Sequence, residues 1–295
     1  MVEVRGSVVG RVATREALRL ARGAVHGFGS LTSWARVTPD LLIVGAMRGG
    51  TTTLYHYLVR HPAVAGAQLD KEVHYFDLHH AAGLGWYRAR FPTRWALRRL
   101  GPRGGGVARV VEATPYYLFH PLVPERVAAE LPHARVIALL RDPVERAWSH
   151  YRHEVDLGYE SLPFDEAIAR EPERLAEAEQ RMRVDPDFAS SAHQHHSYLA
   201  RGRYAEQLDR WFRVVPREQV LVLRSEDLYV RPEATFERVL AFLELPPWSP
   251  DRFRTLNAAS STDLPPATQQ RLRAYFRPHD ARLAELLGTH VWWPA

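Results

Sequence analysis

The stretch LLIVGAMRGGTTTL, residues 41–54, determines how the rest of the sequence is interpreted. An apolar run leads into a glycine-containing turn with one cation, Arg48, and the turn ends in three threonines that open a helix. Glycines let the backbone approach an anion closely, and the first N–H groups of a helix have no partner within the helix. The stretch therefore predicts a cradle that binds a phosphorylated ligand.

The turn differs from the Walker A loop of kinases and ATPases. Its glycines have the Walker spacing, but Thr51 takes the position of the Walker lysine and the cation comes earlier, at Arg48. A P-loop kinase or ATPase also holds magnesium with a carboxylate at the end of a neighbouring strand. The strand expected over residues 135–140 instead leads into Arg141, which suits a second phosphate better than a metal. A P-loop kinase or ATPase stays open as an alternative.

Length and composition indicate one large α/β domain. The chain has 295 residues, no cysteine and a net charge of +5, so it can bury a large core without disulfides. We expect residues 40–295 to form this domain and residues 1–39, which carry five arginines before residue 23, to form a basic helical extension. With no apolar run of about eighteen residues, we expect a cytoplasmic protein without a transmembrane segment. The arginines do not form a continuous run, so nucleic acid is not an expected partner.

Apolar runs alternate with helical patterns, as in a parallel sheet with helical crossovers. The expected strands cover residues 41–44, 64–67, 107–112, 135–140 and 219–223. The expected helices cover residues 52–60, 124–131, 144–155, 164–182, 198–212, 232–243 and 268–287, the last interrupted at Pro278, and residues 185–194 are expected to be a loop. The pattern predicts an α/β fold in which helices flank an open, P-loop-like parallel sheet.

A second anion-binding element is predicted at the end of the fourth expected strand. Arg141 would lie at the carboxyl edge of the sheet, where open α/β sheets bind ligands. Asp142 and Pro143 fit the start of a helix, as its cap and its first residue, and Ser149 follows about two turns later. Alone, an ion-paired Arg141 and a surface Ser149 would explain the segment equally well. Beside the glycine loop, the pair predicts a site for a second phosphate, far from the first.

The segment KEVHYFD, residues 71–77, follows the second expected strand. Its carboxylate, Glu72, has Lys71 and His74 nearby and can remove a proton from an incoming hydroxyl or amine. A solvated charge is the usual explanation for an isolated glutamate in a loop. The position at the sheet edge, just after the glycine loop and its helix, favours a catalytic role.

Histidines near residue 195 raise the question of a metal site. The sequence reads His193-Gln194-His195-His196 there. No carboxylate–histidine cluster at ligand spacing accompanies them, and cysteine is absent. We therefore expect no metal.

Four motifs occur in the order seen in sulfotransferases that use 3′-phosphoadenylyl sulfate (PAPS). They are the glycine loop, KEVHYF at 71–76, EATPYY at 112–117 and RDP…S at 141–149. Over about residues 40–293 the sequence most resembles bacterial relatives of the heparan sulfate type, the glucosaminyl N- and 3-O-sulfotransferases. The resemblance implies the sulfotransferase fold, PAPS as co-substrate, adenosine 3′,5′-bisphosphate as its product and no metal. It also implies transfer to a hydroxyl or amine of a small-molecule or carbohydrate acceptor, such as a glycosylated metabolite.

The same resemblance implies a role for each matching residue. Glu72 would be the general base, and Arg48 would stabilise charge on the oxygen that leaves sulfur. The 5′-phosphosulfate would be held by Arg48, Gly49, Gly50, Thr51, Thr52 and Thr53. The 3′-phosphate would be held by Arg141 and Ser149. The acceptor would lie beside Lys71, His74, Thr114 and Pro115.

The sequence departs from the family pattern in three places. The loop cation is usually lysine but here is Arg48, and Ala113 replaces a lysine of the animal enzymes, for which Lys71 is the expected substitute. Residues 257–262 replace the basic loop and disulfide that precede the last helix of the animal enzymes. These differences argue against a long acidic polysaccharide acceptor. They also leave open a nucleotide- or polyanion-binding protein without turnover.

Overall fold

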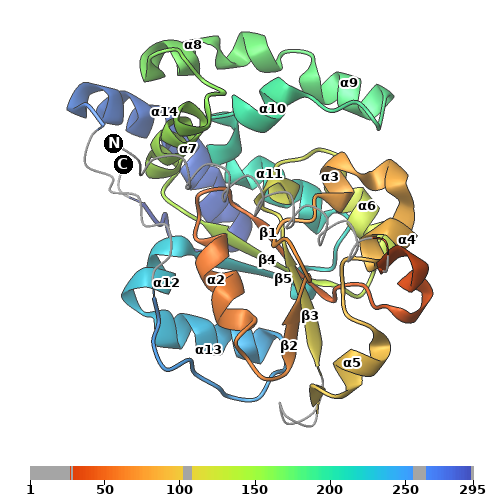
Figure 1. Ribbon diagram of the computed structural model, residues 1–295. Helices are drawn as coiled ribbons and strands as arrows, with labels where there is room; N and C mark the ends of the chain where they lie inside the picture. Colours follow the sequence, from red (N-terminus) through yellow and green to blue (C-terminus); the bar gives the residue numbers. More distant parts are fainter. Residues whose placement is uncertain (1–26, 28, 102–107, 255–263, 294–295) are drawn as a thin grey trace, which may run out of the picture.

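A computed structural model describes residues 27, 29–101, 108–254 and 264–293 of the chain. It has a five-stranded sheet with the order β2-β3-β1-β4-β5, in which every neighbouring pair is parallel. The strands are β1 (Leu41–Gly45), β2 (Val64–Gly66), β3 (Arg109–Ala113), β4 (Arg135–Leu140) and β5 (Val220–Arg224). The predicted open parallel sheet flanked by helices is confirmed (Figure 1). Most of the expected extension over 1–39, and residues 257–262, lie outside the described residues.

Helices cover both faces of the sheet. The longer ones are α2 (Thr51–Leu58), α6 (Val123–Glu130), α7 (Pro143–Leu157), α8 (Phe164–Leu175), α11 (Tyr204–Phe212), α13 (Pro232–Phe242) and α14 (Pro266–Leu287). The shorter ones are α3 (Tyr75–Leu78), α4 (Gly83–Arg88), α5 (Arg94–Arg98), α9 (Ala178–Val184), α10 (Ser191–His195) and α12 (Ser225–Val230). Short 3₁₀ turns add η1 (Ser33–Ala35), η2 (His80–Ala82), η4 (Pro115–Leu118), η5 (Ala200–Gly202) and η6 (Arg217–Gln219).

The central strands β1, β3 and β4 bury both of their faces, because each face of the sheet carries its own apolar layer. Leu42 and Val44 of β1 pack with residues of α6, α11 and α14 on one side. Leu41 and Ile43 pack with residues of α2 and α13 on the other. A strand buried on both faces reads as a continuous apolar run, which is why β1 and β4 were recognisable in the sequence.

Some expected boundaries are wrong. The expected helix over 164–182 is two helices, α8 and α9, and the residues at the break are good helix formers that give no signal of it. Helix α10 overlaps the end of the expected loop over 185–194, and the helix expected from residue 198 begins only at Tyr204. Helix α14 runs through Pro278 without interruption, since Phe276 and Leu283 on either side of it are buried and hold both halves against the core.

The strand order places the loops after β1 and β4 at one crevice. From β1 the chain moves outward to β2 and β3, and it then returns to the other side of β1 with β4 and β5. Such a reversal is the position where open α/β sheets bind ligands. Within the described residues, no helix is both long and apolar enough to cross a lipid bilayer.

Candidate active site

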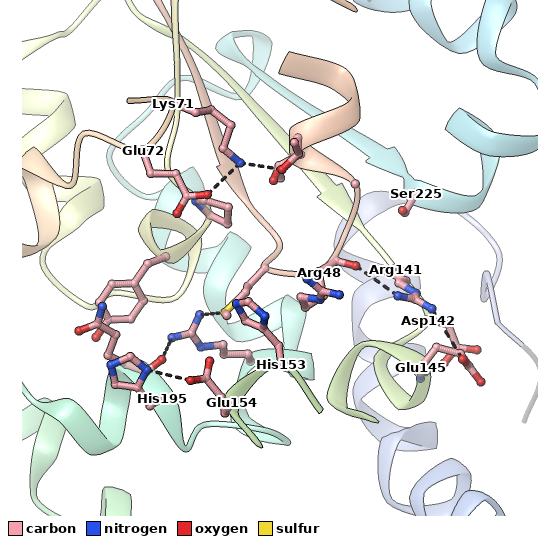
Figure 2. Close-up of a pocket in the computed structure, with 18 of the residues that line it drawn as sticks. Arg48, Lys71, Glu72, Arg141, Asp142, Glu145, His153, Glu154, His195 and Ser225 are labelled. Carbon is pink, nitrogen blue, oxygen red and sulfur yellow. Dashed lines mark hydrogen bonds and ion pairs between the residues drawn. The ribbon is translucent and has the colours of Figure 1, made fainter. Parts of the chain in front are cut away.

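A cavity of about 630 Å³ opens at the carboxyl ends of β1 and β4. Figure 2 shows Arg48 near its middle, with Lys71 and Glu72 on one side and Arg141 on the other. The predicted residues that line it are Arg48, Gly50, Thr51, Thr52, Lys71, Glu72, His74, Pro115 and Arg141. The fold therefore brings together residues from all four motifs, and Arg48 and Arg141 are 93 positions apart in the chain.

The loop after β1 needs its two adjacent glycines. A Cβ atom on Gly49 would lie 2.7 Å from the carbonyl oxygen of Leu139. Gly50 has a φ angle of +90°, and a Cβ atom there would lie 2.6 Å from the Tyr229 hydroxyl. Ser225 also donates a hydrogen bond of 2.7 Å to the Gly49 carbonyl. The loop is thus held tightly against β4 and the start of α12, with the N-terminus of α2 at the cavity.

Arg48 connects the loop to the second predicted element. Its Nε donates to the Ser149 Oγ at 3.0 Å, and its carbonyl oxygen accepts from Arg141 Nη1 at 3.4 Å. Burial, and next the charge of Arg141, lower the pKa of Arg48, but a guanidinium stays charged at neutral pH. The two elements touch because β1 and β4 are neighbours. Arg48, Arg141 and Ser149, which are expected to bind the two phosphates, therefore lie in contact with one another. The separation of the two phosphates stays a prediction.

Arg141 and the start of α7 bring two arginines, Arg141 and Arg273, together with two carboxylates, Asp142 and Glu145. As predicted, Asp142 caps α7, where its Oδ1 accepts from the backbone N–H groups of Val144 at 2.9 Å and Glu145 at 3.3 Å. Asp142 also pairs with Arg273 of α14 at 2.5 Å. The nearest acidic partner of Arg141 is Glu145, at 3.7 Å. Because that pair is long, the Arg141 guanidinium keeps donors for a ligand.

Glu72 belongs to a chain of ion pairs at the other end of the cavity. Lys71 Nζ lies 2.9 Å from Glu72 Oε1 and donates to the Thr52 Oγ1 at 2.9 Å. His74 lies between Glu72, at 3.5 Å, and the buried Asp77, at 2.7 Å. Lys71 therefore joins the carboxylate to the first turn of α2.

These pairs fix the charges of the acidic end. Burial would raise the pKa of Glu72, but hydrogen bonds from His74 and Lys71 outweigh burial and lower it to about 2. Burial would likewise lower the pKa of His74, but Asp77 and Glu72 raise it to about 10. At neutral pH, Glu72 is a carboxylate and His74 is a cation.

Four of the predicted residues do not line the cavity: Gly49, Thr53, Thr114 and Ser149. The Thr53 side chain is buried, Gly49 packs against β4, and Thr114 is buried with its hydroxyl donating to Glu112 at 2.6 Å. The Thr114 hydroxyl also accepts from the backbone N–H of His74 at 3.5 Å, so it positions that residue. Ser149 is buried and reaches the cavity through Arg48.

Buried Glu112 is the centre of a hydrogen-bond network next to the segment that carries Glu72. Its carboxylate accepts hydrogen bonds from Thr114, from Tyr117 at 2.8 Å and from Tyr87. Burial raises the pKa of Glu112 to about 7, although these hydrogen bonds act against the shift. Tyr117 in turn accepts from the backbone N–H of Tyr75 at 2.9 Å. This network fixes the segment that carries Glu72 and His74.

A wall that the sequence analysis did not assign faces the loop. His153, Glu154, Gln194, His195 and Arg201 line this part of the cavity. Glu154 accepts from His195 at 2.9 Å, and His195 stacks on Tyr159 with ring centroids 3.9 Å apart. Helical spacing would have revealed His153, which lies one turn after Ser149 on α7. The contact of His195 with α7 depends on the tertiary packing of α10.

Ser225 and Tyr229 are also lining residues that the sequence analysis missed. Ser225 directly follows β5, so the reasoning that placed Arg141 at the sheet edge applies equally to it. Glu72 and His74 also line a second cavity of about 210 Å³, bounded by Trp86 and Arg90. Within the described part of the chain, no group of three or more His, Cys, Asp or Glu residues is arranged to hold a metal ion.

Comparison with known proteins identifies the family. A model of the sulfotransferase domain matches residues 38–264, so the chain belongs to the sulfotransferase family. The crystal structure of a sulfotransferase from Alicyclobacillus acidocaldarius is similar, with a TM-score of 0.61 and 30% identity, covering 86% of this chain and 97% of that one.

Curated relatives agree with the resemblance seen in the motifs. Heparan sulfate glucosamine 3-O-sulfotransferase 6 of Mus musculus is 29% identical over 86% of this chain and 73% of its own length. The membrane-associated sulfotransferase kil1 of Dictyostelium discoideum is 26% identical over 86% of this chain. The chain spans 66% of the length of that protein. It spans only 22% of the bifunctional heparan sulfate N-deacetylase/N-sulfotransferase 2 of Bos taurus, with 28% identity.

The ion pairs of His74 predict an unusual titration. We expect the imidazole to stay protonated at pH 8, with a pKa of about 10, and Asp77→Asn to lower that pKa by removing the closer carboxylate. Because the folded-state pKa is raised, these interactions stabilise the fold fully below the ordinary histidine pKa of about 6.5 and lose their effect as pH rises through about 10. NMR titration of the imidazole nitrogens measures the pKa of His74 in the wild type and in Asp77→Asn. A neutral His74 in the wild type at pH 8 would contradict the assignment.

Proposed function

We propose that the chain transfers the sulfuryl group of PAPS to a hydroxyl or amine of an acceptor. The arrangement of Arg141, Arg48 and the Lys71–Glu72 pair along one cavity carries the proposal. A bis-phosphorylated donor needs two anion sites close together on one ribose, and its transferable group must face a base. Membership of the sulfotransferase family supports the same chemistry.

The donor would be held by backbone and side-chain groups of the two loops. Arg141 and, through Arg48, Ser149 would bind the 3′-phosphate. The Gly49–Thr52 segment and the N-terminus of α2 would bind the 5′-phosphosulfate. Preorganised donors of this kind stabilise charge on a departing phosphate oxygen without reorganising during the reaction.

Glu72 would accept the proton of the acceptor as its oxygen or nitrogen forms a bond to sulfur. The bond between sulfur and the bridging phosphate oxygen breaks, and adenosine 3′,5′-bisphosphate leaves. His74 is cationic and so cannot be the base; held by Asp77, it orients Glu72. Lys71 is shared between Thr52 and Glu72. An anionic donor would draw Lys71 toward the loop and make the carboxylate more basic.

The acceptor would occupy the side of the cavity bounded by α7 and α10. This wall combines acidic, polar and apolar side chains, namely those of Glu154, His153, Gln194 and Leu157. Glu154 is ionised, because hydrogen bonds from His150 and His195 outweigh burial and lower its pKa to about 2. A carboxylate suits a neutral hydroxylated molecule better than a polyanion. With the relatives named for glucosamine sulfation, these groups support an uncharged carbohydrate.

Donor binding separates the proposal from a kinase or ATPase. Calorimetry should show that adenosine 3′,5′-bisphosphate binds without magnesium and more tightly than ADP with magnesium. Arg141→Gln should weaken adenosine 3′,5′-bisphosphate by about 10–100-fold, as expected for a lost charged hydrogen bond, and should change AMP, which lacks the 3′-phosphate, far less. Arg213→Gln, a control at the exposed C-cap residue of α11, should change neither. Tight binding of ADP with magnesium alone would exclude this donor.

The role of Glu72 is tested by turnover with a panel of neutral carbohydrate acceptors. Glu72→Gln keeps the size of the side chain but removes the base, and should lower the rate of sulfate transfer from PAPS by about 10²–10⁴-fold. Affinity for adenosine 3′,5′-bisphosphate should change little. A variant as active as the wild type would refute the base assignment. Wild type and variant that bind the donor but are both inactive would favour a binding protein without turnover.

A further inference from the structure

A second surface of the molecule exposes large apolar side chains. The exposed fractions are 79% for Leu31, 75% for Trp34 and 63% for Trp95. Tryptophan is usually well buried in a globular fold, so two highly exposed indoles on neighbouring segments need an explanation. None of these residues lines the candidate active site.

The two segments that carry these residues lie side by side. Arg36 and Thr93 form an antiparallel bridge, and the backbone N–H of Val37 donates to the Pro92 carbonyl at 3.2 Å. Trp34 comes two residues before Arg36 and Trp95 two residues after Thr93, so both indoles flank the same bridge. In Figure 1, the red segment before β1 lies next to α4, on the same edge of the molecule as α5.

The charge of this part of the chain is one-sided. Residues 78–111 contain seven arginines and neither Asp nor Glu, although the whole chain carries only +5. Arg94, Arg98 and Arg99 of this stretch are exposed around Trp95. The Arg99 guanidinium lies 3.4 Å from the centroid of the Trp95 ring. The surface therefore combines indole rings with guanidinium groups.

We propose that Leu31, Trp34, Trp95, Arg94, Arg98 and Arg99 form a membrane-docking surface that seats the chain on an anionic lipid bilayer. Indole rings favour the headgroup region of a bilayer, and guanidinium groups bind lipid phosphates. The positive charge complements a negatively charged surface, which selects an anionic bilayer over an apolar protein partner. The six residues lie at the surface on short segments, so the attachment that they provide would be peripheral.

Helix α4 packs against η1, which carries Trp34 of the membrane-docking surface, and α4 also bounds the second cavity. Trp86 of α4 and Arg90, which follows it, line the second cavity together with Glu72. If the proposed function is correct, an acceptor anchored in the bilayer could reach Glu72 from this side. Docking itself does not depend on that function.

Vesicle sedimentation with the full chain tests the docking. We expect binding to phosphatidylcholine vesicles that contain phosphatidylserine, and at least about tenfold weaker binding to phosphatidylcholine alone. High salt should release the protein, because it screens exposed charges. Trp34→Ser with Trp95→Ser should weaken binding by about tenfold or more. Arg98→Gln with Arg99→Gln should weaken it by about fivefold for each arginine removed.

Matched variants elsewhere on the surface serve as controls. Val184→Ser with Val230→Ser removes side chains that are 80% and 77% exposed, and Arg213→Gln with Arg231→Gln removes two exposed arginines. Both pairs should bind vesicles like the wild type, and thermal unfolding should confirm that every variant folds. Failure of the wild type to bind phosphatidylserine vesicles at low salt would overturn the proposal. So would binding that the tryptophan and arginine variants leave unchanged, or self-association through this surface without vesicle binding.

Discussion

The rest of the site depends on one constraint, the contact of Arg48 with Arg141 and with Ser149 of α7. It joins the loop after β1 to the segment after β4, and it exists because these two strands are neighbours in the sheet. The charge of Arg141 lowers the pKa of Arg48, because the two guanidinium groups repel each other. An anion placed between them removes that repulsion, since each charge then has an opposite partner. The fold thus stores positive charge where a bis-phosphorylated ligand would relieve it.

At the opposite end of the cavity, charged groups of opposite sign lie next to each other. There, Glu72 and Asp77 surround His74, and Lys71 completes the chain of alternating charges. The network is rigid because Glu112 and its tyrosine partners hold the same segment from below. With a pKa of about 2, Glu72 is a weak base for as long as both Lys71 and His74 contact it. Because Lys71 is shared between Glu72 and Thr52, donor binding would control that basicity if the proposed function is correct.

Much of the fold could be predicted because its signals are local. The apolar run before Gly45, and the Arg141-Asp142-Pro143 step from strand to helix, each specify their element within a few residues. The position of Arg141 followed from the general rule for sheet edges. The wall formed by His195 and Glu154 could not be predicted in this way, because α10 reaches α7 only through tertiary packing. The buried position of Thr114 depends on Glu112 behind it, and an alternating strand pattern does not reveal that partner.

The proposed sulfuryl transfer and the proposed membrane docking are compatible on one molecule. A surface that rests on lipid, beside a cavity that shares Glu72 with the donor site, would bring acceptor and base into one region. Each part nevertheless stands on its own residues: the arginines and tryptophans of α5 and η1 in one case, and the loops after β1 and β4 in the other.

A crystal structure of the chain with adenosine 3′,5′-bisphosphate tests the central claim most directly. The account predicts the 3′-phosphate against Arg141 and against Arg48, which Ser149 holds. It predicts the 5′-phosphate on the backbone of residues 49–52, with the 5′ end of the ligand toward Glu72. A ligand bound with either phosphate outside these two loops, or with its 5′ end directed away from Glu72, would contradict it.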